Sequence, residues 1–235
     1  MYETPVYLAG CDLCDKGHIR LAAYLREMQK AACLDLNNFD LTPELLHEMG
    51  IAFILSKTSL VVEKTNLPSA ELTLKTYPRQ TTGASFMRDF VFSQNGEVVA
   101  RATTRWGILN LNTRRLVRPS ELPRPIPGES ELWVGFEPPR LAAAKSENAA
   151  LLGCVTVPRC MTDANAHLNN AAYLDLCLNV DADLAFSEMH IEYRKEVKEG
   201  EQLAIYKSEN DDGSYLLYGE KTETGELSFL VELHP

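Results

Sequence analysis

Residues 162–174 read Thr-Asp-Ala-Asn-Ala-His-Leu-Asn-Asn-Ala-Ala-Tyr-Leu. Within this stretch Asp163, Asn165 and His167 place a carboxylate, an amide and an imidazole at alternate positions. These groups can carry acid–base chemistry. However, Asn and Asp are also common at helix starts for structural reasons, and a single His is more often structural than catalytic. The triplet alone leaves both readings open.

A helix is expected directly after this triplet. Apolar residues recur at helical spacing from Ala171 to Leu178. Asn169 or Asn170 would be the N-cap, because a short polar side chain there can accept hydrogen bonds from unpaired backbone N–H groups. The triplet would then approach a helix N-terminus, where free N–H groups and the positive dipole favour developing negative charge.

The composition is that of an ordinary globular protein with an acidic balance. A chain of 235 residues can form one large or two small domains and bury a substantial core without disulfides or metal. The formal charge of −10 argues against general nucleic-acid binding. The sequence has no run of the ~18 apolar residues that span a bilayer. Its first residues lack the features of a signal peptide, so a cytoplasmic location is the default expectation.

The six cysteines do not form a metal-binding pattern in the sequence. Cys11 and Cys14 make one C-x-x-C pair, but no second pair or suitably spaced His accompanies it. A redox role would require a thioredoxin-like context that the sequence lacks. We therefore expect reduced thiols, no metal and no cofactor, since no phosphate loop or nucleotide motif is present either.

The chain reads as a helix followed by antiparallel strands, twice over. In the first half, residues 19–36 predict a helix, Pro43 begins a shorter one, and Asn95-Gly96 predicts a hairpin turn. The strands expected there cover residues 6–8, 53–55, 59–62, 71–77, 86–92 and 98–111. The second half is expected to form a helix at 170–179 and strands at 154–157, 189–193, 202–206, 214–220 and 227–233.

Residues 113–150 interrupt this pattern. Six prolines between positions 119 and 139 rule out a central strand or a continuous helix, although one strand is expected near 132–136. We therefore expect an N-terminal unit at 1–118, a linker at 119–150 and a C-terminal unit at 151–235.

The two halves also resemble each other in sequence. The run Ala-Ala-Tyr-Leu at 22–25 recurs at 171–174, which aligns His18 with His167 and Cys14 with Asp163. Only the second copy keeps the complete polar triplet. A helix on an antiparallel sheet is an α+β arrangement, and a duplicated unit is expected to pack about a pseudo-twofold axis.

Glu196 is a further residue that distinguishes the second copy. It ends the run Glu-Tyr-Arg-Lys-Glu at 192–196, and its counterpart in the first copy is Thr65. The structural alternative is a surface carboxylate at a strand end, beside Lys195 and Lys198.

Together these motifs resemble the plant and bacterial acyl-ACP thioesterases. The similarity rests on Asp-x-Asn-x-His-x-Asn-Asn-x-x-Tyr at 163–173 and on the run at 192–196. Segments 88–90, 102–109 and 113–115 resemble the family in the same order, so the resemblance covers nearly the whole chain. It implies a double hotdog, in which two tandem helix-on-sheet units form a pseudo-dimer.

The resemblance implies a catalytic set of Asp163, Asn165, His167 and Glu196. Plant members often have Cys directly after the Glu, but Val197 stands there in this chain, which excludes a thiol nucleophile at that position. In our preferred version Glu196 activates a water, His167 orients the network or donates, and Asn165 positions the thioester or a catalytic partner. Asp163 would hold His167 or, in the rival version, attack directly. The sequence does not separate these versions.

The implied reaction is hydrolysis of acyl-acyl carrier protein, which releases free fatty acid and ends fatty acid synthesis. The acyl chain would lie in the N-terminal unit beside the 19–36 helix, although an apolar stripe is also typical of plain core. Candidate wall residues are Leu25, Met28, Ile54 and Phe86. The carrier is acidic in this family, and the candidate docking residues are Arg114, Arg115 and Arg118, with Lys195 and Lys198 as further candidates.

Two other functions remain open. One is an acyl-CoA thioesterase of the same fold, which would use nearly the same residues; the long tandem chain with its linker favours acyl-ACP. The other is a non-catalytic acyl-thioester-binding regulatory module, against which the complete catalytic set argues. The preferred chain length, saturation and branching, and a homodimer of the double hotdog, cannot be decided from the sequence.

Overall fold

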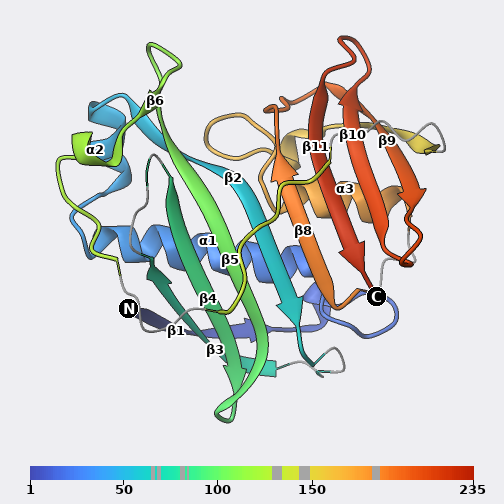
Figure 1. Cartoon of the computed structure of the whole chain (residues 1–235), viewed down its shortest axis with the longest axis horizontal. Helices are drawn as coiled ribbons and strands as arrows, with labels where there is room; N and C mark the ends of the chain where they lie inside the picture. The colour runs from blue at the N-terminus through green and yellow to red at the C-terminus, as the bar shows by residue number, and fades with distance from the viewer. Residues whose placement is uncertain are drawn as a thin grey trace.

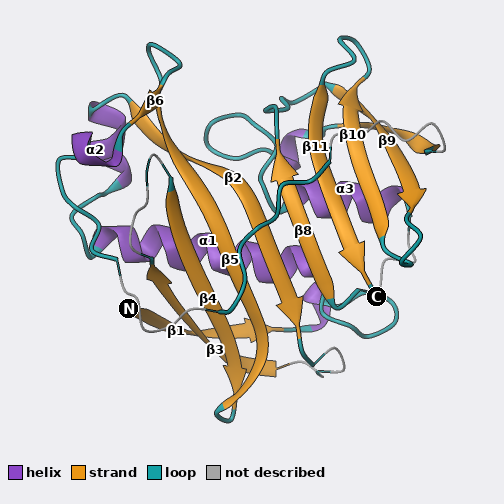
Figure 2. Cartoon of the chain, in the orientation of Figure 1, coloured by secondary structure: helices purple, strands orange, loops and turns teal. Residues whose placement is uncertain are grey.

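The computed structural model describes residues 1–64, 67, 70–79, 83, 85–128, 134–142, 149–181 and 186–235. Within these residues the chain forms one antiparallel sheet with its two longer helices on one face (Figures 1 and 2). None of the described helices combines the length and the apolar character needed to cross a membrane.

The elements of the first half follow the expected order. Its helices are α1 (Leu21–Asn37) and α2 (Pro43–Glu48). Its strands are β1 (Tyr2–Leu8), β2 (Ile51–Val62), β3 (Ala70–Pro78), β4 (Phe86–Gln94), β5 (Glu97–Asn110) and the short β6 (Leu116–Val117). Two local predictions are confirmed: α2 begins at Pro43, and Asn95 and Gly96 both have positive φ in the turn between β4 and β5. At the start of α2 the Thr42 hydroxyl accepts a hydrogen bond from the N–H of Leu45.

The second half repeats this order without the extra helix. Its strands are β7 (Ala150–Thr156), β8 (Glu188–Tyr193), β9 (Gln202–Glu209), β10 (Tyr215–Lys221) and β11 (Leu227–His234). Its helix is α3 (Ala172–Val180). Single-turn 3-10 helices cover Gly10–Asp12, Pro119–Glu121 and Arg159–Met161.

The strand order explains how the halves combine. It runs β1-β3-β4-β5-β2-β8-β11-β10-β9-β7, with β6 paired to β5. Each half has the same internal connectivity, and the two meet where β2 pairs with β8 from Lys57↔Glu192 to Val61↔Glu188. The order is therefore symmetric about this joint, as a pseudo-twofold axis requires. The expected α+β double hotdog is confirmed.

The core is continuous across the joint. The buried face of α1, from Ala22 to Ala32, belongs to the same apolar cluster as buried residues of α3, β8 and β11. The two helices also contact each other directly, since the Arg26 guanidinium lies 2.9 Å from the Asp175 carboxylate. The two halves therefore share one core, and we treat them as one folding unit.

Residues 134–142 of the linker cross the sheet on the face opposite the helices (Figure 1). Lys57 Nζ donates to the carbonyl of Pro139 at 2.8 Å, and the N–H of Leu141 donates to Glu192 Oε2 at 3.0 Å. Because Lys57 and Glu192 are paired across the β2–β8 joint, these linker residues, here called the linker strap, lie over the strand pair that joins the two halves.

Two sequence expectations need correction. Residues 53–55 and 59–62 were expected as separate strands, but they form the single strand β2. A bulge between Leu55 and Lys57 shifts the pairing register with β5, so the strand continues where the alternation of apolar and polar residues is interrupted. A strand was expected near 132–136; residues 134–136 form no strand, and 132–133 lie outside the described residues. The N–H of Val134 instead donates to the Asp89 carboxylate at 3.4 Å.

Candidate active site

The loop that carries the polar triplet is a copy of a loop in the first half. An isolated bridge joins Leu13 to Ile19, and an equivalent bridge joins Thr162 to Leu168. In both loops the first aligned residue donates its N–H to the carbonyl of the aligned histidine at 2.8 Å: Cys14 to His18, and Asp163 to His167. The alignment of Cys14 with Asp163 made from the sequence is therefore confirmed in three dimensions.

One residue of this loop has an unusual backbone conformation. Ala166 has φ of +59°, whereas the equivalent residue in the first copy, Gly17, has φ of +78°. A side chain at positive φ is sterically costly for a residue other than glycine. The second copy thus has the same turn as the first, but with alanine in place of the glycine that adopts positive φ without steric cost.

Asp163 shapes this loop. Its Oδ1 accepts the backbone N–H of Asn165 at 2.8 Å and the backbone N–H of His167 at 3.4 Å. These contacts form an Asx turn that fixes the direction in which the loop leaves Asp163. Asp163 thus contacts the backbone of His167, and it acts on the imidazole through the loop and through its charge.

Backbone pairing brings Glu196 to His167. The N–H of Leu168 donates to the carbonyl of Val197 at 2.7 Å, and His167 forms a bridge with Lys198. With the two segments side by side, His167 Nε2 lies 2.7 Å from Glu196 Oε2. The buried side chain of Val197 anchors the segment, which explains why an apolar residue follows the glutamate.

Arg114 approaches the same carboxylate from the other half of the protein. It lies in the turn between β5 and β6, and its guanidinium contacts Glu196 Oε1. The sequence placed Arg114 in a docking patch for a partner and gave no indication of this contact. The two residues are 82 positions apart, and no local pattern connects them.

The surroundings of His167 favour its neutral form. Burial lowers the pKa of His167, and the cations Lys198 and Arg114 lower it further, while the carboxylate of Asp163 opposes them. Glu196 would also be expected to favour the imidazolium, but its charge is shared with Arg114. The pair is therefore best described as a neutral imidazole that donates from Nε2 to a carboxylate.

The start of α3 offers fewer free donors than the sequence suggested. The side-chain oxygen of Asn169 accepts the N–H of Ala171 at 3.0 Å, and its carbonyl accepts the N–H of Ala172 at 2.9 Å. The expectation of Asn169 or Asn170 as the N-cap is therefore wrong: α3 begins at Ala172, its N-cap is Ala171, and no side chain caps it. The N–H groups of Ala171 and Ala172 are engaged within the protein.

A cavity of about 480 Å³ runs from this loop into the first half of the protein. One end is lined by Asp163, Ala164 and Asn165. The rest of its wall comes mainly from α1, α2, β2, β4 and β5, including Leu36, Leu46, Phe53, Phe86, Met87 and Trp106. The volume and the mostly apolar wall are those of a small-molecule site.

The four candidate wall residues lie in different places. Phe86 lines this cavity. Leu25 and Met28 are buried beside a smaller cavity of about 10 Å³, which also borders Asn170 and Trp106. Ile54 lines neither cavity, and 37% of it is exposed.

The cavity wall also contains a buried ion pair. The Arg88 guanidinium lies 2.7 Å from Asp35 Oδ2 and 3.2 Å from the Thr76 hydroxyl. Burial lowers the pKa of Arg88, while the adjacent Asp35 carboxylate raises it. Both side chains are almost fully buried, so the pair presents a polar but neutralised surface to the cavity.

The remaining candidate cations are exposed. Arg115 and Arg118 lie on either side of β6, on the hairpin that also carries Arg114. Lys195 is paired with Glu226 at 3.2 Å. The hairpin thus presents cations close to Glu196, which Arg114 contacts.

Comparison with known proteins agrees with this description. Residues 148–232 match the family model of the acyl-ACP thioesterase C-terminal domain. A chloroplastic palmitoyl-acyl carrier protein thioesterase of Gossypium hirsutum is 26% identical over 174 residues, which are 67% of this chain and 41% of that protein. The chain therefore spans less than half the length of this curated relative. The family resemblance inferred from the motifs is confirmed.

Solved structures share the fold over nearly the whole chain. An acyl-ACP thioesterase from Bacteroides thetaiotaomicron superposes with a TM-score of 0.85 at 15% identity, covering 99% of this chain and 96% of that one. The 12:0-ACP thioesterase from Umbellularia californica gives 0.78 at 15% identity, covering 99% and 96%. At such identities the likeness establishes the double-hotdog fold.

The contact between Arg114 and Glu196 leads to a test that does not depend on any activity. We expect Arg114→Gln to raise the pKa of His167, because the variant removes a cation near the imidazole and leaves the Glu196 charge free to stabilise the imidazolium. The measurement is a titration of the His167 ring resonances by NMR. Arg115→Gln, which removes the same charge one residue away, serves as the control. An unchanged or lowered pKa in Arg114→Gln would show that Arg114 does not contribute to the site.

Proposed function

We propose that this chain, whose residues 148–232 match the acyl-ACP thioesterase C-terminal domain, hydrolyses acyl-acyl carrier protein to a free fatty acid and the carrier thiol. The observation that carries the proposal is the His167–Glu196 pair, held at 2.7 Å by a loop that also forms one end of the 480 Å³ cavity. In the proposed arrangement the second half supplies the reacting groups and the first half holds the acyl chain.

In this proposal Glu196 is the general base. Its carboxylate accepts a proton from water, and the water oxygen attacks the thioester carbonyl carbon. The C–S bond then breaks as the tetrahedral intermediate collapses, and the departing thiolate takes up the proton. His167 holds one carboxylate oxygen of Glu196 through the Nε2 hydrogen bond, and the Arg114 guanidinium contacts the other.

Asn165 is proposed to bind the thioester carbonyl. It belongs to the cavity lining, and its side chain is exposed rather than committed to the core. An amide N–H directed at the developing oxyanion stabilises the transition state more than the ground state. This role replaces the one first expected for the start of α3, where the N–H groups of Ala171 and Ala172 already have partners.

The central prediction concerns Glu196 and His167. Glu196→Gln and His167→Ala should each lower kcat on acyl-ACP by roughly 10²- to 10⁴-fold, the range for loss of a general acid–base group. Thiol release from a panel of acyl-ACPs and matching acyl-CoAs measures this, with circular dichroism to show an intact fold. Near-normal activity in both variants would remove the assignment. Turnover of acyl-CoA alone would change the substrate class, and tight binding without turnover would indicate a regulatory module.

A second prediction separates the two roles considered for Asp163. Since its Oδ1 accepts two backbone N–H groups, Asp163→Asn can keep the loop while losing the charge. We expect Asp163→Asn to retain activity within about tenfold of the wild type and Asp163→Ala to lose considerably more, because the Asx turn is lost. The measurement is single-turnover hydrolysis. An Asp163→Asn variant as inactive as Asp163→Ala would instead favour direct attack by Asp163.

The β5–β6 hairpin is proposed to receive the acidic carrier. The charge-reversed double variant Arg115→Glu/Arg118→Glu should raise KM for acyl-ACP about tenfold and flatten its dependence on salt, while kcat stays unchanged. Arg140→Glu, an exposed arginine in the linker, is the matched control. If KM and its salt dependence were unchanged in the double variant, the carrier would have to dock elsewhere.

A further inference from the structure

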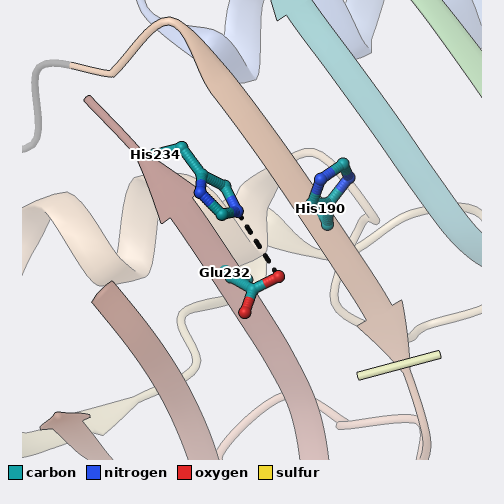
Figure 3. Close-up of side chains that lie close together, drawn as sticks. All are labelled: His190, Glu232 and His234. Atoms are coloured by element: carbon teal, nitrogen blue, oxygen red, sulfur yellow. Dashed lines mark ion pairs between the residues drawn. The ribbon is translucent and has the colours of Figure 1, made fainter. Parts of the chain in front are cut away.

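Two histidines and two glutamates alternate on one face of β8 and β11, away from the candidate active site. In the register of the two strands, His190 lies opposite Glu232, and Glu188 lies opposite His234. The residues between them, Met189 on β8 and Leu233 on β11, are buried in the core that also contains the buried side chains of α3. The four polar side chains therefore project from the opposite face of the sheet, where Figure 3 shows His190, Glu232 and His234 converging.

Three of these side chains have the spacing of metal ligands. One ligand atom each from His190, Glu232 and His234 can be chosen so that all lie within 4.8 Å of one another. His234 Nε2 is 3.5 Å from Glu232 Oε2, close to the ~3.3 Å edge of a tetrahedral site with ligand distances of ~2 Å. The two imidazole rings have centroids 5.6 Å apart at an angle of 73°, so modest rotations would direct both rings at one ion.

A hydroxyl across the joint holds the His190 ring. Ser59 of β2, which pairs with His190 in the β2–β8 register, lies with its Oγ 2.7 Å from His190 Nδ1. Ser59 is completely buried, and the His190 side chain is only 12% exposed. With Nδ1 bonded to Ser59, the ring presents Nε2 for coordination, as in metal sites where the other ring N–H is fixed by a neighbouring oxygen.

The local charge favours a cation. Glu188 Oε1 lies 3.0 Å from His190 Nε2, and Glu188 and Glu232 together bring two carboxylates to the cluster. Nitrogen ligands favour zinc and its transition-metal neighbours over magnesium or calcium.

We propose that His190, Glu232 and His234 form a zinc site on the outer face of the C-terminal unit, with Ser59 orienting His190. The ion would join β8 to the end of β11, where the N–H of Ser187 also donates to the carbonyl of His234 at 3.2 Å. Because Ser59 lies on β2, the site would also reinforce the joint between the two halves. This role is structural and does not depend on the proposed hydrolysis.

The test uses the full chain without a histidine tag, stripped of metal by a chelator and kept reduced. Calorimetric titration with Zn²⁺ should give one equivalent per chain, and saturation should raise Tm by about 5 to 10 °C at a hundredfold excess over Kd. Co²⁺ as a spectroscopic probe should give visible bands of a tetrahedral site without thiolate charge-transfer absorption.

Variants decide whether the cluster is responsible. His234→Gln, whose side chain is 31% exposed, and Glu232→Gln should weaken Zn²⁺ binding at least a hundredfold and abolish the Tm rise. Ser59→Ala should weaken binding about tenfold, the usual effect of losing a group that orients a ligand. His18→Gln, which alters a histidine outside the cluster, should leave binding unchanged.

Three outcomes would overturn the proposal. They are the absence of Zn²⁺ binding by the wild type, full binding by a His190→Gln/His234→Gln double variant, and a thiolate spectrum with Co²⁺, which would point to the cysteines. Thermal unfolding of the metal-free variants shows whether each still folds, so a loss of binding can be separated from a loss of structure.

Discussion

The pairing of β2 with β8 is the constraint on which the rest of the structure depends. It joins two five-stranded arrays into one sheet and sets α1 and α3 on the same face. It also brings the cavity of the first half to the polar loop of the second. Without this joint the loop at 163–165 would have no wall opposite it, and Arg114 would not reach Glu196. The linker strap over Lys57 and Glu192 covers the same line.

The two copies show how a duplicated unit can divide its tasks. Both keep the hairpin-like loop before the helix, with the same bridge and the same N–H to carbonyl contact. In the first copy Cys14 occupies the position of Asp163, and its thiol cannot accept backbone hydrogen bonds as the carboxylate does. The first copy also has Gly17, which adopts positive φ without steric cost, where the second has Ala166. The first copy instead carries α2, whose residues line the cavity. The first copy thus provides most of the cavity wall, and the second copy provides the polar loop at one end of the cavity.

Patterns confined to neighbouring residues were predictable from the sequence. The Asn95–Gly96 turn, the start of α2 at Pro43 and the alignment of the two loops all depend on contacts a few residues apart. The position of Glu196 beside His167 was predictable only through the family resemblance. Periodicity alone could not decide which apolar residues line the cavity, because helical spacing shows which face of a helix is buried but not whether that face borders a cavity. Phe86 lines the large cavity, whereas Leu25 lines only the smaller one.

Features that depend on register between distant strands were not predictable. The bulge in β2 shifts the pairing of every residue after it, and no residue type at that position predicts a bulge. His190, Glu232 and His234 form no sequence motif, since the first two come together only through the pairing of β8 with β11. The expectation of no metal-ligand cluster was drawn from sequence spacing, and spacing says nothing about residues joined by a sheet.

The electrostatics of the site also belong to both halves. Glu196 is 38% exposed in a chain of formal charge −10, so a lone carboxylate there would favour protonation of its histidine partner. Burial lowers the pKa of His167, and Arg114, delivered by the β5–β6 turn of the first half, lowers it further. A neutral imidazole can donate to Glu196 without removing its ability to accept a proton from water. In the proposed mechanism the second half contains the reacting groups, and one of the charges that lower the pKa of His167 belongs to Arg114, which the β2–β8 joint brings within reach.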